Sequence, residues 1–116
     1  MGGRIATHVA AADGDLPIKG LVLLGYPLHP PGRPDQRRDK HLPAIQQPML
    51  FVQGSRDAFG TPAELEPVLA ALPRKATLHV VPGGDHSFKV TRADRAERAA
   101  INADLYRTVV EWITSI

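Results

Sequence analysis

The stretch "MLFVQGSRDAFGTPAELEPVLA", residues 49–70, joins the pattern of a buried strand to that of a capped helix. Its first part, Met49–Gly54, is a short continuous apolar run without the alternation of a half-exposed strand, so a strand buried on both faces is predicted. Thr61 is the expected N-cap of the helix and Pro62 its first residue. Glu64, three residues after Thr61, completes a capping box and fixes where the helix begins.

Apolar runs on both sides of this stretch predict two further strands. Leu21–Leu24 has a glycine at each end and is expected, like the first strand, to be buried on both faces. Ala76–Val81 is the third strand. The helix between the last two strands is expected to run to about Leu72 and to stop at Pro73, because proline cannot continue a helix.

Two more helices complete the predicted order of elements. Gly3 to Ala12 carries apolar side chains at three- and four-residue spacings. A long final helix has Thr91 and Asp94 as candidate caps. Its apolar stripe repeats every three or four residues and consists of Ile101, Leu105, Val109, Trp112 and Ile116. Alternating helices and buried strands predict an α/β domain of three layers, with a parallel sheet between helices on both faces.

Composition limits the possible partners. The chain has 116 residues, enough for one domain with a usable core. The net charge is only +2 and the charges are interleaved, so no nucleic-acid partner is expected. No apolar run approaches the roughly 20 residues of a membrane helix, so no membrane partner is expected either. Without cysteine, disulfides and thiolate chemistry are excluded, and a cytoplasmic location is expected.

An acid and a base follow two of the predicted strands. Asp57 lies three residues past Gly54, and His86 follows the third strand. Because consecutive parallel strands lie side by side, their carboxyl ends meet, and a hydrogen bond between Asp57 and His86 is expected. That bond would make His86 an effective general base. The alternative is that Asp57 is a loop or cap carboxylate and His86 a turn or surface histidine. Against it, Thr61 already caps the helix, so Asp57 is not needed as a cap. Asp85 is expected to be a turn residue.

The connection Pro27–Pro48 contains six prolines and is predicted to be a long irregular loop with a functional role. It supplies His29 and Arg33 as candidate substrate-binding residues, and Phe59, beside Asp57, is a third. Arg33 is suited to steering an acidic substrate, with a solvated loop arginine as the alternative.

The remaining histidines and the serines have weaker claims to chemistry. A metal site of His29, His41 and an aspartate of the same loop matches no compact ligand pattern, so no metal and no cofactor is expected. Structural positions are expected for His8 on a helix surface and for His79 in a strand. The serines lie off any sharp strand-to-helix turn and are not expected nucleophiles: Ser55, Ser87 and Ser115.

Four segments together resemble the alpha/beta hydrolase superfamily, in particular its small dienelactone-hydrolase-like branch. They are "MGGRIA" (1–6), "GLVLLGYPLHPPG" (20–32), "HLPAIQQPMLFVQGSRDAFG" (41–60) and "VVPGGDHSF" (80–88). The resemblance implies that residues 1–116 are the C-terminal half of such a domain, with about three strands and an incomplete N-terminus.

The resemblance also implies a chemistry. Asp57 is the acid and His86 the base of a Ser-Asp-His triad. "MGG" resembles the end of a G-x-S-x-G motif, in which Met1 follows the nucleophilic serine and takes the oxyanion-hole position. The full-length form would then be a serine hydrolase for small-molecule ester or similar acyl bonds, and this chain, lacking the serine, would be inactive alone. The alternative is a non-catalytic binding or scaffolding module that forms a homodimer or oligomer through an exposed sheet edge.

Overall fold

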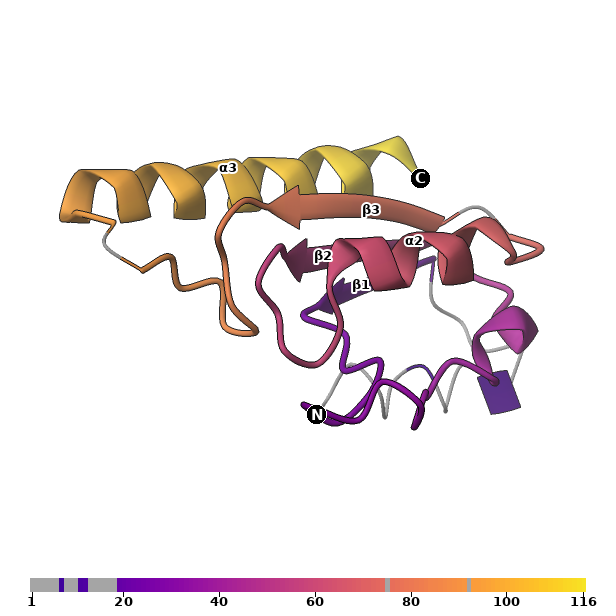
Figure 1. The fold of residues 1–116 in the computed structure, drawn as a ribbon. Coiled ribbons are helices and arrows are strands. Elements are labelled where there is room, and N and C mark those ends of the chain that lie inside the picture. Colours follow the sequence, from indigo (N-terminus) through magenta and orange to yellow (C-terminus); the bar gives the residue numbers. More distant parts are fainter. Residues whose placement is uncertain (1–6, 8–10, 13–18, 75, 92) are drawn as a thin grey trace.

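The computed structural model describes residues 7, 11–12, 19–74, 76–91 and 93–116. Within them three strands, β1 (Leu21–Leu24), β2 (Met49–Gly54) and β3 (Ala76–Val81), form one sheet in the order β1-β2-β3. Both pairings are parallel, and the arrowheads in Figure 1 point the same way. The strands predicted from apolar runs are confirmed, and their carboxyl ends share one edge of the sheet.

Strand β2 is the centre of the described fold, and all of its residues are buried. It has a strand on each side, and its side chains alternate between the two faces of the sheet. Met49 and Phe51 belong to one apolar cluster, whereas Leu50 and Val52 belong to another. The sheet therefore separates two cores, one under each helical layer.

Helix α2 (Pro62–Ala70) covers the first core. The predicted capping box is confirmed: the Thr61 hydroxyl accepts from the backbone N–H of Glu64, and the Glu64 carboxylate accepts from the backbone N–H of Thr61. The helix ends two residues before the predicted Leu72. The backbone N–H of Leu72 already bonds the Leu69 carbonyl in a tighter turn, which ends the α-helical pattern ahead of the proline.

Helix α3 (Arg95–Ser115) covers the second core on the other side of the sheet (Figure 1). Asp94 is its N-cap and accepts from the backbone N–H of Glu97. The prediction that Thr91 takes part in capping is wrong, because Thr91 lies in the turn that the bond from the Ala93 N–H to the Val90 carbonyl closes, ahead of the cap. Four members of the predicted stripe pack on the second core: Ile101, Leu105, Val109 and Trp112. Ile116 follows the last helical residue and stays exposed.

The prediction that β1 is buried on both faces is confirmed only at Leu23, because Leu21 and Val22 are half-buried. Leu24 is 55% exposed, because β1 pairs with β2 alone among the described residues and the chain leaves the sheet directly after it. The Pro27–Pro48 connection is irregular, as predicted, apart from a short 3-10 helix, η1 (Leu42–Ala44). Most of the helix predicted from Gly3 to Ala12 lies outside the described residues, and so does Met1.

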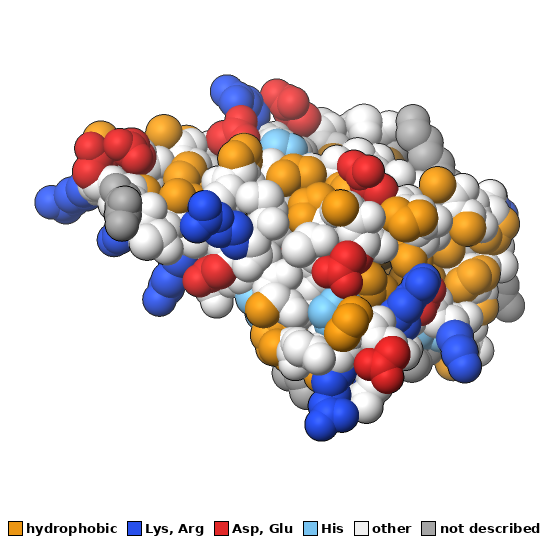
Figure 2. All heavy atoms as spheres, in the orientation of Figure 1, with side chains coloured by type: hydrophobic (Ala, Val, Ile, Leu, Met, Phe, Trp, Pro, Cys, Tyr) orange, Lys and Arg blue, Asp and Glu red, His pale blue; other side chains and the backbone are white. Residues whose placement is uncertain are grey.

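Charged side chains of both signs lie on the visible surface (Figure 2), and the described helices show no membrane-spanning character. Figure 2 shows acidic and basic side chains interspersed over the visible face, in keeping with a net charge of +2. In the part of the chain that the structure describes, no helix combines the length and the apolar character that a membrane span requires.

Candidate active site

Two loops meet at the carboxyl ends of β2 and β3. We call residues 55–60, between β2 and the cap of α2, the acid loop, and residues 82–90, after β3, the histidine loop. The backbone N–H of Arg56 in the acid loop donates to the carbonyl of Gly84 in the histidine loop at 2.9 Å. This bond between neighbouring loops helps to fix the relative positions of the two predicted site residues, Asp57 and His86.

A close backbone approach at Gly54 brings the loops together. A Cβ atom at this position would lie 2.2 Å from the Gly84 carbonyl oxygen, far inside van der Waals contact. The Ser55 hydroxyl, next in the chain, accepts from the backbone N–H of Gly83 at 2.6 Å. Only glycine lets the end of β2 lie against the histidine loop in this way.

Asp57 and His86 form the expected hydrogen bond. Nδ1 of His86 donates to Oδ2 of Asp57 at 2.8 Å. Asp57 is 1% exposed, and a polar group buried to this degree is unfavourable unless it is hydrogen-bonded. Its carboxylate has two more donors: the backbone N–H of Phe59 donates to Oδ1 at 2.8 Å, and Nε2 of Gln53 donates to Oδ2 at 3.2 Å. Three donors therefore hold the carboxylate in one orientation.

The bond to Asp57 fixes the tautomer of His86. Because a carboxylate only accepts, the hydrogen lies on Nδ1 and the lone pair of the neutral ring on Nε2. The His86 side chain is 31% exposed, and its Nε2 has no hydrogen bond to the described residues. The Phe59 ring lies against the imidazole, with the ring centroids 4.4 Å apart. The arrangement is that of a general base with an accessible lone pair.

The segment after β1 forms a third side of the site. Gly25 has a left-handed φ of 73°, and a Cβ there would lie 2.8 Å from the His86 carbonyl oxygen and 3.3 Å from its Nδ1. This segment therefore supports both the backbone and the ring of His86.

Hydrogen bonds within the histidine loop hold its shape. Oδ1 of Asp85 accepts from the backbone N–H groups of Ser87 and Lys89 at 2.9 and 3.0 Å, which confirms Asp85 as a turn residue. These bonds, with that from Lys89 first, lower the pKa of the Asp85 carboxyl. Phe88 adopts a left-handed φ of 63°, unusual for a bulky residue. Asp85 thus shapes the loop while His86 carries the functional group.

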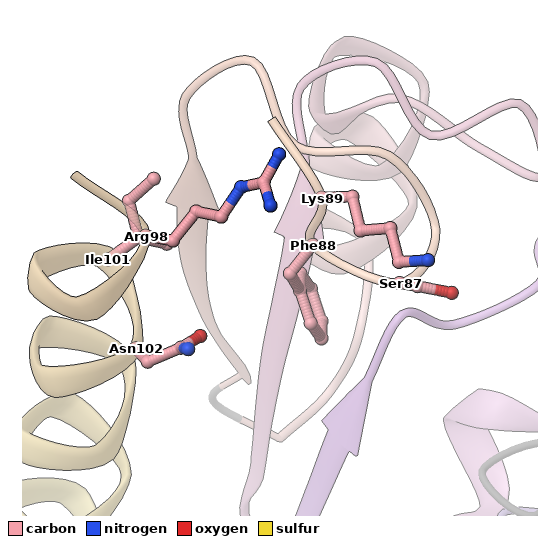
Figure 3. Close-up of a pocket in the computed structure, with 6 residues that line it drawn as sticks. All are labelled: Ser87, Phe88, Lys89, Arg98, Ile101 and Asn102. Carbon is pink, nitrogen blue, oxygen red and sulfur yellow. The ribbon is translucent and has the colours of Figure 1, made fainter. Parts of the chain in front are cut away.

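A pocket of about 400 Å³ lies between the histidine loop and α3 (Figure 3). Its lining combines two apolar, two polar uncharged and two cationic side chains, and the residues are Ser87, Phe88, Lys89, Arg98, Ile101 and Asn102. Since three of these directly follow His86, a molecule in this pocket lies beside the loop that carries the base.

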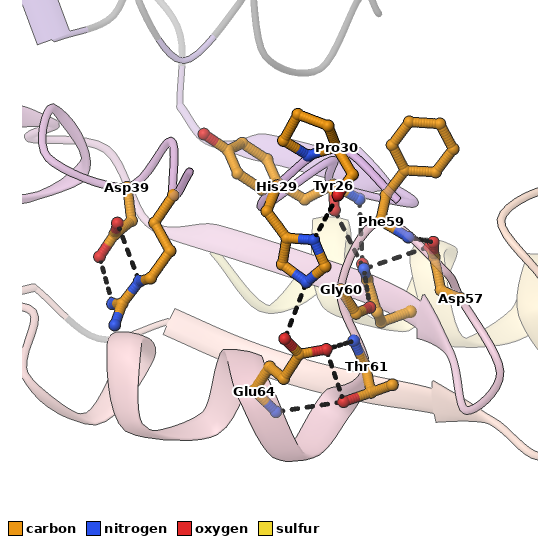
Figure 4. Close-up of polar contacts among 11 residues, drawn as sticks. Tyr26, His29, Pro30, Asp39, Asp57, Phe59, Gly60, Thr61 and Glu64 are labelled. Carbon is orange, nitrogen blue, oxygen red and sulfur yellow. Dashed lines mark hydrogen bonds and ion pairs between the residues drawn. The ribbon is translucent and has the colours of Figure 1, made fainter. Parts of the chain in front are cut away.

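His29 lies within the fold and contacts α2 (Figure 4). Its Nδ1 donates to the Pro30 carbonyl at 2.8 Å and its Nε2 to the Glu64 carboxylate at 2.7 Å. Since both partners only accept, both ring nitrogens carry hydrogen and the ring is charged. The Pro30 carbonyl and then Glu64 raise the pKa of His29 against the effect of burial. Neither ring nitrogen remains for a substrate. His29 instead links the Pro27–Pro48 connection, which we call the proline-rich loop, to α2.

The structure disperses the other predicted residues of the proline-rich loop. Arg33 is exposed, and its side chain has no ion pair with the described residues. Nε2 of His41 lies 2.7 Å from the Thr7 hydroxyl, and Asp39 pairs with Arg37 at 2.6 Å. The candidate metal ligands of this loop therefore have separate partners rather than a common centre.

His79 has a structural partner, as expected. Its Nε2 lies 3.4 Å from Oδ2 of Asp104 on α3, at the outer edge of the sheet. This ion pair joins β3 to the helix that covers it.

Two residues of the site were missed by sequence reasoning. Gln53 is a lone polar residue in an otherwise apolar buried strand, and this is the signal that would have found it. Gly25 ends the apolar run of β1, where a glycine suggests a close backbone approach. Both signals are local, but what the residues contact depends on the three-dimensional fold.

The described residues provide no nucleophile for His86. The Ser55 hydroxyl accepts from the Gly83 N–H, and no hydroxyl of the described residues bonds Nε2 of His86. Met1, predicted to follow the nucleophile, lies outside the described residues. The site therefore consists of an oriented acid–base pair with one open position at Nε2.

A comparison with protein families agrees with the α/β fold. A family model described as an alpha/beta hydrolase domain matches residues 1–114, nearly the whole chain.

Proposed function

Because the chain belongs to the alpha/beta hydrolase domain family, we propose that it provides the acid and the base of a serine hydrolase for ester or similar acyl bonds. The observation that supports this most is the 2.8 Å bond from His86 to buried Asp57, which leaves Nε2 of His86 open. An imidazole oriented in this way is what acyl transfer to a serine requires. Membership of the dienelactone-hydrolase-like branch is part of the proposal.

The proposed reaction has two steps, each with one proton carried by His86. Nε2 takes the hydroxyl proton of a serine that precedes Met1, the serine oxygen attacks the acyl carbon, and the alcohol leaves with that proton. Water then repeats the sequence on the acyl-enzyme and releases the acid. Asp57 stabilises the imidazolium in both steps, and the backbone N–H of Met1 donates to the oxyanion.

Of the three residues predicted to bind substrate, Phe59 is the one whose ring lies against His86. Its ring covers one side of the His86 ring, and its backbone N–H holds Asp57. An apolar acyl or alcohol group packed against Phe59 would lie beside Nε2. The pocket between the histidine loop and α3 would provide further substrate contacts, including its two cationic side chains.

The test uses the chain together with the sequence encoded in frame before Met1, assayed on p-nitrophenyl acetate. His86→Ala and Asp57→Asn are each expected to lower kcat by roughly 10³-fold or more. His79→Ala, a histidine paired with Asp104 at the sheet edge, is the matched control and should leave the rate unchanged. A fluorophosphonate probe should label one serine upstream of Met1. Full activity in both site variants, or no labelled serine, overturns the proposal.

Exposed apolar side chains favour a second candidate function, a non-catalytic module that associates through its sheet edge. Leu24 is 55% exposed on β1, and α3 exposes Tyr106, Val110 and Ile113. A strand with an open edge readily pairs with another chain. If the β1 edge forms the contact, Leu24→Lys should convert oligomers to monomers in sedimentation velocity runs. If Tyr106→Lys dissociates the oligomers and Leu24→Lys does not, the contact is assigned to α3 instead of β1.

A further inference from the structure

Gln53 is the one polar residue of β2, and it is fully buried. A buried amide is unfavourable unless its donors and acceptors are satisfied. Here they are: Oε1 accepts one hydrogen bond, and Nε2 lies within hydrogen-bond distance of three acceptors. Gln53 is therefore more than a filler of the core, and its partners show what it connects.

The first partner is the segment after β1. The strand ends at Leu24, yet Oε1 of Gln53 accepts from the backbone N–H of Tyr26 at 2.9 Å, and Nε2 donates to the Tyr26 carbonyl at 3.0 Å. The side-chain amide thus continues the pairing of β1 with β2 where the backbone of β1 has left the sheet. It holds Tyr26, and with it Gly25, against His86.

The second partner is the acid loop. Nε2 of Gln53 donates to the Gly60 carbonyl at 2.7 Å and to Oδ2 of Asp57 at 3.2 Å. Figure 4 shows Tyr26, Asp57 and Gly60 around these bonds. The Asp57 oxygen is the same one that accepts from Nδ1 of His86. Two amide hydrogens serve three acceptors, so one hydrogen is shared between two of them.

We propose that Gln53 is a positioning residue, which fixes the Asp57 carboxylate for His86 and ties the segment after β1 to the acid loop. The role in catalysis rests on the proposed function, whereas the role in orienting the pair does not. The Phe59 N–H, another donor to Asp57, belongs to the same loop as Asp57 itself. Gln53 instead donates from β2, a buried strand that is paired on both sides, and it therefore ties the carboxylate to the sheet.

The first test reads the His86 proton directly by NMR and needs no activity. A hydrogen bond from Nδ1 to a buried carboxylate slows exchange of its proton with water, so a low-field Nδ1 proton signal is expected. Gln53→Met keeps the length of the side chain but removes the amide, and the signal should be lost. Val52→Ala changes a buried neighbour on the opposite face of β2 and should keep the signal at comparable loss of stability.

The second test measures activity and separates the two proposals. If the protein hydrolyses p-nitrophenyl acetate, Gln53→Met should lower kcat about a hundredfold with little change in KM, because the base is misplaced. Gln53→Asn keeps an amide, but one too short to reach Asp57, and should lower kcat as much as Gln53→Met does. An equal effect of the two variants would exclude loss of polarity as the cause. If the wild-type chain, extended by the sequence encoded in frame before Met1, is inactive but shows the predicted NMR change, only the hydrolase is contradicted.

Three results would overturn the positioning role. One is a low-field signal that persists in both Gln53 variants. Another is its equal loss in Val52→Ala, which would make it a general effect of stability. The third is failure of both Gln53 variants to fold while Val52→Ala folds, which would assign the glutamine to folding alone.

Discussion

Gly25 shows how much of the site depends on a single missing side chain. It combines a left-handed φ of 73° with a position against both the backbone and the ring of His86. Gly32 has nearly the same φ, 75°, but an added Cβ there would meet no atom within 4 Å. The two glycines therefore separate the effect of backbone conformation from the effect of contact.

Gly25→Ala should destabilise the protein more than Gly32→Ala. Both changes carry the cost of a left-handed alanine, about 1 kcal/mol each, but only the first also forces His86 to move. Urea unfolding gives the stabilities, and the low-field signal of His86 should change only in Gly25→Ala. Equal stabilities with an unchanged signal would show that the segment after β1 does not support the histidine.

The hydrogen-bonded pair of the candidate site was predictable, and the two residues that support it were not. Asp57 and His86 each follow a recognisable strand, and parallel strands bring such residues to one edge. The bonds of Gln53 to Tyr26 join residues 27 positions apart, and Gly25 meets His86 from a different segment of the chain, so no local pattern pairs them. Long-range contacts of this kind appear only once the fold is known.

The ion pair of His29 and Glu64 joins two elements, the proline-rich loop and α2. The backbone N–H of His29 also donates to the Phe59 carbonyl at 2.9 Å, so the pair lies next to the acid loop. The pKa of Glu64 is lowered by the Thr61 N–H first and by His29 as well. The same carboxylate thus caps α2 and holds the loop.

The stability that this pair contributes should depend on pH in a defined window. The folded pKa of His29 is raised above 6.5, so its contribution is full below pH 6.5 and is lost as the pH rises through the folded pKa. The folded pKa of Glu64 is lowered below 4.5, so its contribution is present above pH 4.5 and is lost as the pH falls through the folded pKa. The pair should stabilise most between these two values.

The measurement compares the free energy of unfolding of the wild type and of His29→Gln across the pH range. The difference should be largest between pH 4.5 and 6.5 and should decrease on both sides. Glu64→Gln should reduce the dependence that His29 confers above pH 6.5 without abolishing it, because the Pro30 carbonyl still raises the pKa of His29. A difference that keeps growing from pH 6.5 to 9 would contradict a charged His29 in the folded state.

Prediction of the elements succeeded where the signal was local. The capping box at Thr61 and Glu64 needs only neighbouring residues, and it begins α2 as expected. At α3 two cap candidates lay three residues apart, and the turn that precedes the helix selected Asp94 over Thr91. The sequence carries both signals, but the path of the histidine loop decides between them.

At the scale of the whole molecule, the sheet separates two cores, and this explains the one error about strand burial. A continuous apolar run indicates burial on two faces, which is fulfilled in β2 because α2 and α3 cover it. In β1 the same pattern ends at an exposed Leu24, since coverage depends on neighbours that the run itself does not encode.

Two separate cores predict additive effects of mutations placed in different layers. Leu65 of α2 is fully buried in the first core, and Leu105 of α3 packs against the second. Leu65→Ala should cost about 2–5 kcal/mol of unfolding free energy, and Leu105→Ala less, because its side chain is only partly buried. Since the two share no cluster, the double variant should equal the sum within about 0.5 kcal/mol.

The matched control places both changes in one core. Leu23 of β1 belongs to the same cluster as Leu65, so Leu23→Ala and Leu65→Ala share partners, and their effects should depart from additivity. Urea unfolding of the single and double variants, with the m-values checked for constancy, gives both coupling energies. A coupling between Leu65 and Leu105 as large as that between Leu23 and Leu65 would mean that β2 transmits packing changes between the layers instead of isolating them. The acid–base pair would then respond to the packing of both helices, because the acid loop continues directly from β2 and the histidine loop leads into α3.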